Sequence, residues 1–341
     1  MHCERQNRRL SPSRERPSQA GSIIGLQSKD TLVVASLWVI LLVGFPLFFW
    51  GGPGYYSSRS FQAAWDLGHI LFFSSLSLLL HQGIVKKGNV RSPLLPFLAI
   101  FVLVLLIGFL VEFLQMFTGN RSPDLGDVCR NQLGCLLAYA FFIRPPLWDN
   151  RRVQLVLRTV VLVLLSVAVW PLLRSGMDEL QAARDFPVLS DFETPFERYR
   201  WVNFQQLQEE NEIVRHGRKS VRVQLSVAQY SGIHLFYFPH DWRGYRALHC
   251  SVYNPQGAGF IINTRIHDNR HKERKMEFND RYNQQFSLGH GWNDLVISLE
   301  KVKNAPKGRT MDMEHIEGFG VFVVQQPHPT VLYLDHIYLA R

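Results

Sequence analysis

The sequence predicts two unlike halves, a bundle of five membrane-spanning α-helices and then an all-β sandwich domain. Apolar stretches of membrane-spanning length lie in residues 31–173, whereas residues 185–341 contain none. The later half instead alternates short β-prone runs with turn residues. The composition changes near residues 175–186, which divides the chain into four parts: a disordered basic tail (1–30), a four-helix membrane domain (31–143), a fifth helix with a linker (144–184) and the β-domain (185–341).

Five apolar segments account for the predicted bundle. A hydrocarbon core of about 30 Å requires about 20 helical residues, because backbone groups in lipid must be satisfied within the segment. Residues 32–50, 94–117 and 153–173 meet that length cleanly. Residues 63–82 and 125–143 carry several polar side chains but are otherwise apolar enough to insert within a bundle.

The basic residues between these segments predict their orientation. Twelve Lys and Arg fall in the tail and in loops 83–93 and 144–152, whereas loops 51–62 and 118–124 hold one each. The positive-inside rule then places the N-terminus in the cytoplasm, and five spans place the β-domain on the other side. Most of the net charge of +9 belongs to the membrane half, a distribution that argues against nucleic acid as a partner and for membrane lipids.

Polar residues of three predicted spans are expected at the same, outer leaflet. Charged side chains inside spans are costly, and three- or four-residue spacing puts each group on one helical face. One interpretation is a cluster of ion pairs that fixes helix packing. The other is an outward-facing polar pocket, in which Glu112 acts as a base or ligand and Arg121 or Arg130 receives an anionic headgroup or phosphate. The residues concerned are Asp66, His69, Glu112, Gln115, Arg121, Asp124, Asp127, Arg130 and Asn131.

The same residues carry a resemblance to a known family. Glu112-Phe-Leu-Gln115, Arg121-Ser-Pro-Asp124 and the run from Asp127 to Gly134 resemble the signature of VanZ-like membrane proteins. Asp66 and His69 match a polar pair of an earlier helix, although the Lys that often follows the Asp is Leu67 here. The resemblance covers about residues 32–143 and implies a protein of the bacterial inner (cytoplasmic) membrane. The family is named for a glycopeptide-resistance protein, and no established active site comes with it.

The β-domain resembles jelly-roll, galactose-binding-like modules of the carbohydrate-binding kind. The resemblance lies in Asp191-Phe-Glu193, in the run from Asp241 to Tyr245, in Gly291-Trp-Asn293 and in Leu334-Asp-His-Ile337. It implies an extracytoplasmic domain that binds a glycan or cell-wall ligand. Acidic residues near the two ends of such modules often hold a structural calcium ion, and Asp191, Glu193 and Asp335 occupy matching places.

Aromatic and polar side chains suggest where a glycan would bind. Sugar rings stack on aromatic faces while arginine binds hydroxyl groups, which makes Trp242, Tyr245, Arg270 and Trp292 candidate ligand-binding residues. For Trp292 a place in the core is the competing interpretation. The polar stretch of residues 268–282 is either solvated surface or one side of a binding face for an anionic glycan.

Three functions follow from these features. The first is a non-enzymatic envelope protein that displays a glycan-binding module. The second is a membrane enzyme or carrier for a lipid-linked glycan or phospholipid, and the third is an assembly protein whose β-domain binds a protein partner. The first is favoured because the sequence contains no phosphate-binding glycine loop, no HExxH and no G-x-S-x-G. The oligomeric state stays open.

Overall fold

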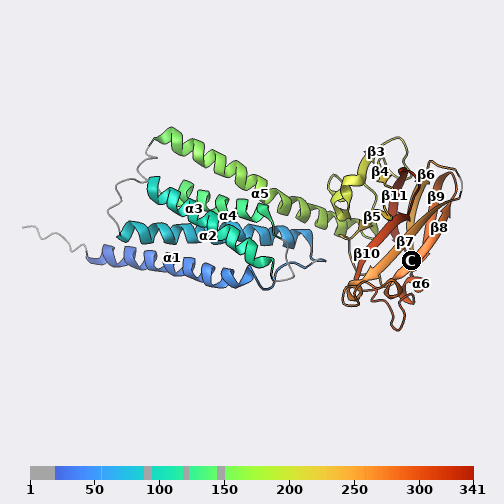
Figure 1. Cartoon of the computed structure of the whole chain (residues 1–341), viewed down its shortest axis with the longest axis horizontal. Helices are drawn as coiled ribbons and strands as arrows, with labels where there is room; N and C mark the ends of the chain where they lie inside the picture. Colours follow the sequence, from blue (N-terminus) through green and yellow to red (C-terminus); the bar gives the residue numbers. More distant parts are fainter. Residues whose placement is uncertain (1–19, 55, 88–93, 118–122, 144–149, 258) are drawn as a thin grey trace, which may run out of the picture. The chain divides into compact units, whose positions relative to one another are not determined.

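The computed structural model of the chain describes residues 20–54, 56–87, 94–117, 123–143, 150–257 and 259–341, with side chains from residue 31 onward except those of residues 85–87. The chain divides into two compact units (Figure 1). The first comprises residues 1–50 and 69–161, and the second comprises residues 51–68 and 162–341. Most of the predicted basic tail therefore lies outside the described residues.

The first half of the chain is helical, as the apolar runs predict. Four of the five helices exceed twenty residues, and the fourth ends in a short π-helix. The helices are α1 (Ala20–Leu47), α2 (Arg59–Lys87), α3 (Leu94–Gln115), α4 (Leu125–Leu137) with its π-helical continuation Ala138–Phe142, and α5 (Arg151–Asp185).

In the part of the chain that the structure describes, three stretches of helix are long and apolar enough to cross a membrane: Arg59–Ile84, Leu94–Gln115 and Arg151–Asp185. Within the described residues, the apolar part of α1 is the shorter Thr31–Leu47, and α4 has 13 residues. The structure therefore supports a helical membrane region, but exactly five spans are not confirmed. The helices of this region expose large apolar side chains, among them Leu106, Leu155 and Val167, which suit a lipid environment.

Helix α5 continues beyond the predicted span and includes residues expected to form a linker. It runs to Asp185, and no proline interrupts its last turns before Pro187. Leu180 and the alanines that follow it are strong helix formers, which favours continuation.

The second half of the chain is an antiparallel β-sandwich. One sheet has the strand order β3-β4-β11-β6-β9, with β1 added to β11, and the other has the order β2-β5-β10-β7-β8. We call them sheet A and sheet B. The strands are β1 (Val188–Ser190), β2 (Trp201–Val202), β3 (Leu207–Glu210), β4 (Ser220–Leu225), β5 (Tyr230–Leu235), β6 (Ala247–Asn254), β7 (Phe260–Asp268), β8 (Tyr282–Leu288), β9 (Gly291–Ser298), β10 (Ile316–Val324) and β11 (Thr330–Ala340).

Alternation along the strands explains the core between the sheets. In β4, Val221, Val223 and Leu225 are almost fully buried, while the residues between them are half-exposed. Strand β5 behaves in the same way, with Ile233 and Leu235 inside. Two tryptophans, Trp201 and Trp242, are fully buried in this core.

The start of α2 packs on the sandwich, within the same unit. Arg59 forms an ion pair with Asp178 of α5, and its guanidinium lies 5.0 Å from the ring centre of Tyr237. Asp178 also binds Arg200, through bonds of 2.9–3.1 Å. All three charged groups are largely or fully buried, because their side chains are 1–11% exposed.

Candidate functional site

Three polar side chains of the helical region form a buried hydrogen-bonded group. His69 of α2 bonds through Nδ1 to Oδ1 of Asn131 on α4 at 2.9 Å. Its Nε2 lies 3.5 Å from a carboxylate oxygen of Asp127, one helical turn earlier on α4. His69 and Asn131 are both buried. The imidazole is thus held from both sides, and its orientation is defined by two neighbours on one helix.

Two glycines allow these side chains to meet. A Cβ on Gly134 of α4 would lie 2.5 Å from the backbone oxygen of Ile70, so α2 and α4 approach closely only because this residue is glycine. On α3, a Cβ on Gly108 would lie 2.9 Å from the amide nitrogen of Asn131. Gly134 therefore sets the distance between the helices, and Gly108 provides the space for the amide.

The remaining predicted polar residues surround this group. Glu112 of α3 accepts the backbone N–H of Asp124 at 2.7 Å, which joins α3 to the N-terminal cap of α4. Arg130 forms ion pairs with Asp127 (2.5 Å) and Asp124 (3.4 Å). Gln115 is buried and donates to the backbone oxygen of Phe48 at 2.9 Å.

Two further predicted residues, Asp66 and Arg121, complete the set. Asp66 lies one helical turn before His69 on α2. Arg121 lies outside the described residues. Of the two arginines predicted to receive an anionic headgroup or phosphate, the structure therefore describes only Arg130, which pairs with Asp127 and Asp124. Hydrogen bonds and ion pairs join His69, Glu112, Asp124, Asp127, Arg130 and Asn131. Their mutual pairing is compatible with either a packing role or a functional one.

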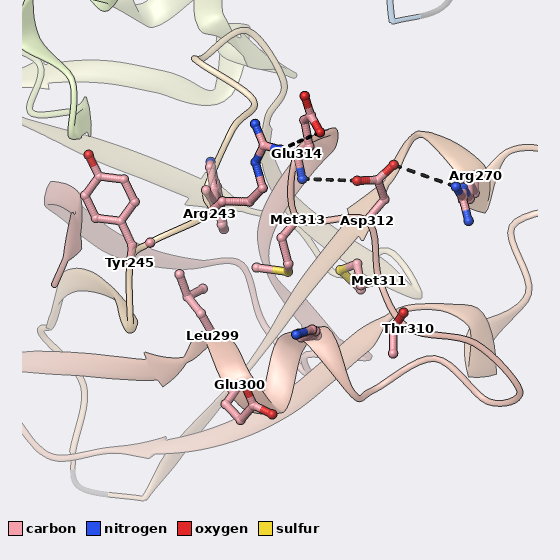
Figure 2. A pocket seen from close by; sticks show the side chains of 13 residues that line it. Arg243, Tyr245, Arg270, Leu299, Glu300, Thr310, Met311, Asp312, Met313 and Glu314 are labelled. Atoms are coloured by element: carbon pink, nitrogen blue, oxygen red, sulfur yellow. Dashed lines mark hydrogen bonds and ion pairs between the residues drawn. The ribbon is translucent and has the colours of Figure 1, made fainter.

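Three of the four predicted ligand-binding residues line one cavity of the β-sandwich (Figure 2). Its volume is about 540 Å³, and its walls include Trp242, Tyr245 and Arg270. Trp292 lies elsewhere, on β9 of sheet A, with its ring 5.5 Å from that of Tyr253.

The charged groups around this cavity pair mostly with one another. Arg243 bonds to Asp241 at 2.7 Å. It also bonds to Glu314 at 2.7 Å, and Arg270 lies 4.0 Å from Asp312 (Figure 2). Trp242 is fully buried, so its ring belongs to the core. The cavity accordingly offers a ligand little aromatic surface beyond Tyr245.

A second hollow of similar size lies on the outer face of sheet B. Its volume is about 570 Å³, and the large exposed rings of Tyr230 and Phe278 lie at its surface. We call it the sheet B groove. It is lined by Asn203, Gln206, Ser226, Ala228, Tyr230, Ser231, Gly232, His234, Arg265, Met276, Phe278, Arg281 and Phe322.

The register of sheet B explains the floor of this groove. His234 of β5, Gly320 of β10 and Arg265 of β7 are direct cross-strand neighbours. A Cβ on Gly320 would lie 2.2 Å from Nδ1 of His234 and 3.1 Å from Cγ of Arg265. The side chains of His234 and Arg265 therefore extend across Gly320, parallel to the sheet, and the space above them stays open. Individual strands read from sequence cannot show this, because the hollow depends on which residues become neighbours.

The sheet B groove is positively charged. Burial, together with the charges of Arg265 and Arg281, lowers the pKa of His234 to about 3, so the imidazole is neutral near pH 7. Its Nδ1 is buried and has no hydrogen-bond partner among the described residues. Burial also lowers the pKa of Arg281, whose guanidinium lies 5.4 Å from the ring centre of Phe278. None of the described lining residues is acidic.

The three predicted calcium ligands bind backbone N–H groups. Asp335 of β11 is buried, and its Oδ2 accepts from Arg215 and His216 at 2.7 and 2.9 Å. Oε1 of Glu193 accepts from Arg218 and Lys219 at 2.6 and 2.9 Å. The two carboxylates thus hold the loop of residues 215–219.

The fit of this arrangement to a calcium ion is partial. Oδ1 of Asp335 is buried and has no hydrogen-bond partner within the described residues, as a calcium ligand would require. Asp191 instead accepts the N–H of Glu193 at 3.4 Å. In the part of the chain that the structure describes, no three or more His, Cys, Asp or Glu side chains are grouped to hold a metal ion. Calcium therefore stays a prediction.

Comparison with known proteins identifies the helical region. Residues 22–148 match the family model VanZ-LLP1, described as VanZ/LLP1. This stretch of the chain is VanZ-like. The match confirms the resemblance that the residues from Glu112 to Gly134 predict, and the buried group of His69, Asp127 and Asn131 belongs to this VanZ-like region. No curated protein matches the chain.

Solved structures that resemble part of the chain are carbohydrate-binding modules and agarases. A family 11 module from Clostridium thermocellum, in complex with a mixed-linked tetrasaccharide, is 14% identical and covers 45% of this chain and 94% of its own, with a TM-score of 0.33. A family 30 module of a cellulosomal cellulase from the same organism is 15% identical, with coverage of 40% and 82% and a TM-score of 0.33. An exo-beta-agarase is 12% identical, with coverage of 39% and 22% and a TM-score of 0.31.

Proposed function

We propose that this chain is a non-enzymatic protein of the bacterial inner membrane that holds a glycan-binding β-sandwich on the extracytoplasmic side. The observation that carries the proposal is the sheet B groove, where exposed aromatic rings lie beside hydrogen-bonding groups. Tyr230 and Phe278 are 65% and 64% exposed. Large apolar rings that are exposed to water together are typical of a surface that binds a ligand. Asn203, Gln206 and the two arginines supply planar donors and acceptors for hydroxyl groups.

The proposed orientation rests on the charge of the loops and on one packing contact. Loop 51–58 and the sandwich belong to the same unit, and the ring of Tyr56 lies 6.1 Å from that of Phe236. The positive-inside rule independently assigns this loop and the β-domain to the same, outer side. A reporter that is active only after export should be active when it is fused after Arg341. A reporter that is active only in the cytoplasm should be active when it is fused to the N-terminus. A cytoplasmic signal from the C-terminal fusion would reverse the proposed topology.

Glycan binding can be tested with the full-length chain in nanodiscs of a neutral lipid. We expect Tyr230→Ala to weaken binding of an oligosaccharide ligand at least about fivefold, because truncation of an aromatic side chain that anchors a binding site typically costs about 1 kcal/mol or more. The residue is exposed, so the melting temperature should not change.

Arg270→Gln is the matched comparison for this experiment, because Arg270 lines the cavity of Figure 2 and not the groove. Loss of binding in Arg270→Gln with full binding in Tyr230→Ala would move the ligand to that cavity. Absence of binding to any member of an oligosaccharide panel at millimolar concentration would refute glycan binding itself.

A second candidate function, an enzyme or carrier for a lipid-linked glycan, draws support from the buried group around His69. A histidine held by an amide and a carboxylate is oriented as general bases often are. The binding experiments with oligosaccharides in nanodiscs also distinguish a binding protein from an enzyme. Recovery of the ligand in chemically altered form would favour the enzyme.

The calcium prediction is tested by thermal unfolding of the full-length chain. A bound ion at a hundred times its dissociation constant stabilises a protein by about 2.7 kcal/mol. We therefore expect millimolar calcium to raise the melting temperature relative to EDTA, and Asp335→Asn to remove the increase. Identical melting curves in calcium and EDTA would show that backbone N–H groups alone satisfy these carboxylates.

A further inference from the structure

Helix α5 carries a tryptophan and an arginine at the point where its apolar part ends. From Thr159 to Leu173 the helix has no charged side chain, and Arg174 follows directly. Trp170 lies one helical turn before Arg174 and is 48% exposed. Tryptophan and tyrosine are enriched at membrane–water interfaces, where one end of the side chain meets lipid and the other meets water. We therefore expect this turn of α5 at the surface of the bilayer.

A short 3-10 helix of the β-domain packs against this stretch of α5, within the same unit. The ring of Phe196 lies 5.9 Å from that of Trp170. The guanidinium of Arg174 lies 3.8 Å from the centre of the Tyr199 ring, and that of Arg198 lies 5.6 Å from it. Two positive charges, one from the helix and one from the β-domain, are thus held beside one aromatic ring.

Neither arginine has a carboxylate partner within the described residues, because the acidic groups nearest in sequence bind elsewhere. Asp178, one turn after Arg174, pairs with two other arginines. Glu179 accepts from the backbone N–H and the hydroxyl of one serine. Glu197, next to Arg198, accepts two backbone N–H groups at 2.6 and 2.8 Å. Nε of Arg174 also has no hydrogen-bond partner in the part of the chain that the structure describes.

The surface of α5 that leads to Arg174 is apolar and exposed. Val163, Val167 and Trp170 precede Arg174 at intervals of three and four residues, so all four lie on one face of the helix. The three apolar residues are 57%, 66% and 48% exposed. A ligand that matches both the apolar face and the two guanidinium groups has an acyl chain and an anionic head. That is the chemistry of an anionic phospholipid and not of a soluble anion.

We propose that Arg174 and Arg198 bind the phosphate of an anionic phospholipid, whose acyl chain lies along Val163 and Val167. Guanidinium groups bind phosphate through paired N–H donors, and basic residues next to a membrane are attracted to anionic lipids. The bound headgroup contacts α5 through Arg174 and the β-domain through Arg198, and so holds the start of the β-domain at the membrane surface. This inference depends neither on glycan binding nor on the side of the membrane on which the β-domain lies.

Native mass spectrometry of the full-length chain in detergent tests the inference. The chain is titrated with phosphatidylglycerol, which is anionic, and with phosphatidylcholine, in which the choline cancels the charge of the phosphate. We expect one phosphatidylglycerol molecule to bind about tenfold more tightly than phosphatidylcholine, because its charge is not compensated within the headgroup. Millimolar glycerol phosphate, which has the phosphate without acyl chains, should not displace the lipid.

Variants of the two arginines locate the lipid. Arg174→Gln and Arg198→Gln should each weaken phosphatidylglycerol binding about fivefold, and phosphatidylcholine binding less than about twofold. Arg198 is exposed, so its variant tests the site without disturbing the fold. Arg184→Gln is the matched control, because it removes the same charge from an exposed position of α5 about 15 Å further along the helix axis. It should leave both affinities unchanged.

Three results would overturn the inference. Equal affinity for the two lipids would show that the arginines do not select an anionic headgroup. A preference for phosphatidylglycerol that persists in both Arg174→Gln and Arg198→Gln would place the lipid elsewhere on the chain. Displacement by glycerol phosphate would show that the site binds a soluble phosphate and not a lipid.

Discussion

Replacing Asp178 by alanine is expected to lower the free energy of unfolding of the unit that contains the sandwich by about 3–5 kcal/mol. Asp178 of α5 is 2% exposed and receives bonds from Arg200 and Arg59. Arg200 is as deeply buried, and within the described residues its other hydrogen-bond acceptor is the backbone oxygen of Leu189 at 3.0 Å. Without the carboxylate, the Arg200 guanidinium stays buried and loses the counter-charge to which it is hydrogen-bonded, which is the costly case.

Thermal unfolding in detergent, followed by tryptophan fluorescence, measures the effect. Trp201 and Trp242 are fully buried in the sandwich and report on its unfolding. For a unit of this size we expect the melting temperature to fall by roughly 6–20 °C. Asp241→Ala is the control, because it removes a carboxylate from an exposed pair with Arg243 and should leave the melting temperature nearly unchanged. Equal melting temperatures for Asp178→Ala and the unmodified chain would show that the buried pair does not stabilise the unit.

The role of Asp178 could not be predicted from sequence. It lies in the part of the chain where a linker is predicted, 22 residues before Arg200 and 119 after Arg59. Periodicity identifies residues that share a face of one helix, but not the partner that a face meets across such a distance. Only the continuation of α5 to Asp185 brings Asp178 to the sandwich.

Local spacing was informative where helices are close neighbours. The intervals between Asp127, Arg130 and Asn131 place them on one side of α4, and the structure pairs that side with His69. Gly134, one turn further on, permits the close approach of α2. The spacing thus predicted which residues lie together, while their chemical role stays a hypothesis.

In the β-domain the fold could be predicted from the sequence, but the candidate site could not. Alternation and turn residues predicted the strands and the sandwich, because side-chain period and burial are local properties. The sheet B groove was not predicted, since it arises from register: Gly320 lies between His234 and Arg265 only after β10 inserts between β5 and β7. The one useful signal was the polar stretch of residues 268–282, for which an anionic glycan was one of two interpretations.

Replacing Arg309 by alanine is expected to cost about 3–5 kcal/mol near pH 7. Arg309 is 9% exposed and binds two carboxylates that are more buried still, Asp268 at 0% and Asp280 at 5%. Its hydrogen bond is the main cause that lowers the pKa of Asp280. Without the guanidinium, two negative charges stay buried close to one another.

The cost should depend on pH in a defined direction. In the unmodified chain the lowered pKa of Asp280 contributes stability that is complete above the unfolded value of about 3.9 and is lost as the pH falls through the folded value. In Arg309→Ala the hydrogen bond that lowers the pKa of Asp280 is lost while burial still raises that pKa, so protonation of Asp280 removes one of the buried negative charges as the pH falls. Protonation of His271, which lies 3.3 Å from Asp280, acts in the same direction.

The difference in stability between the two proteins should therefore shrink from pH 7 to pH 4. Urea unfolding at the two pH values measures it, with Arg243→Ala as the control. Arg243 also binds two carboxylates, Asp241 and Glu314, but that cluster is exposed, so its loss should have little effect at either pH. A difference for Arg309→Ala that is the same at both pH values would mean that the lost stability comes from packing around the arginine stem and not from the uncompensated charges of Asp268 and Asp280.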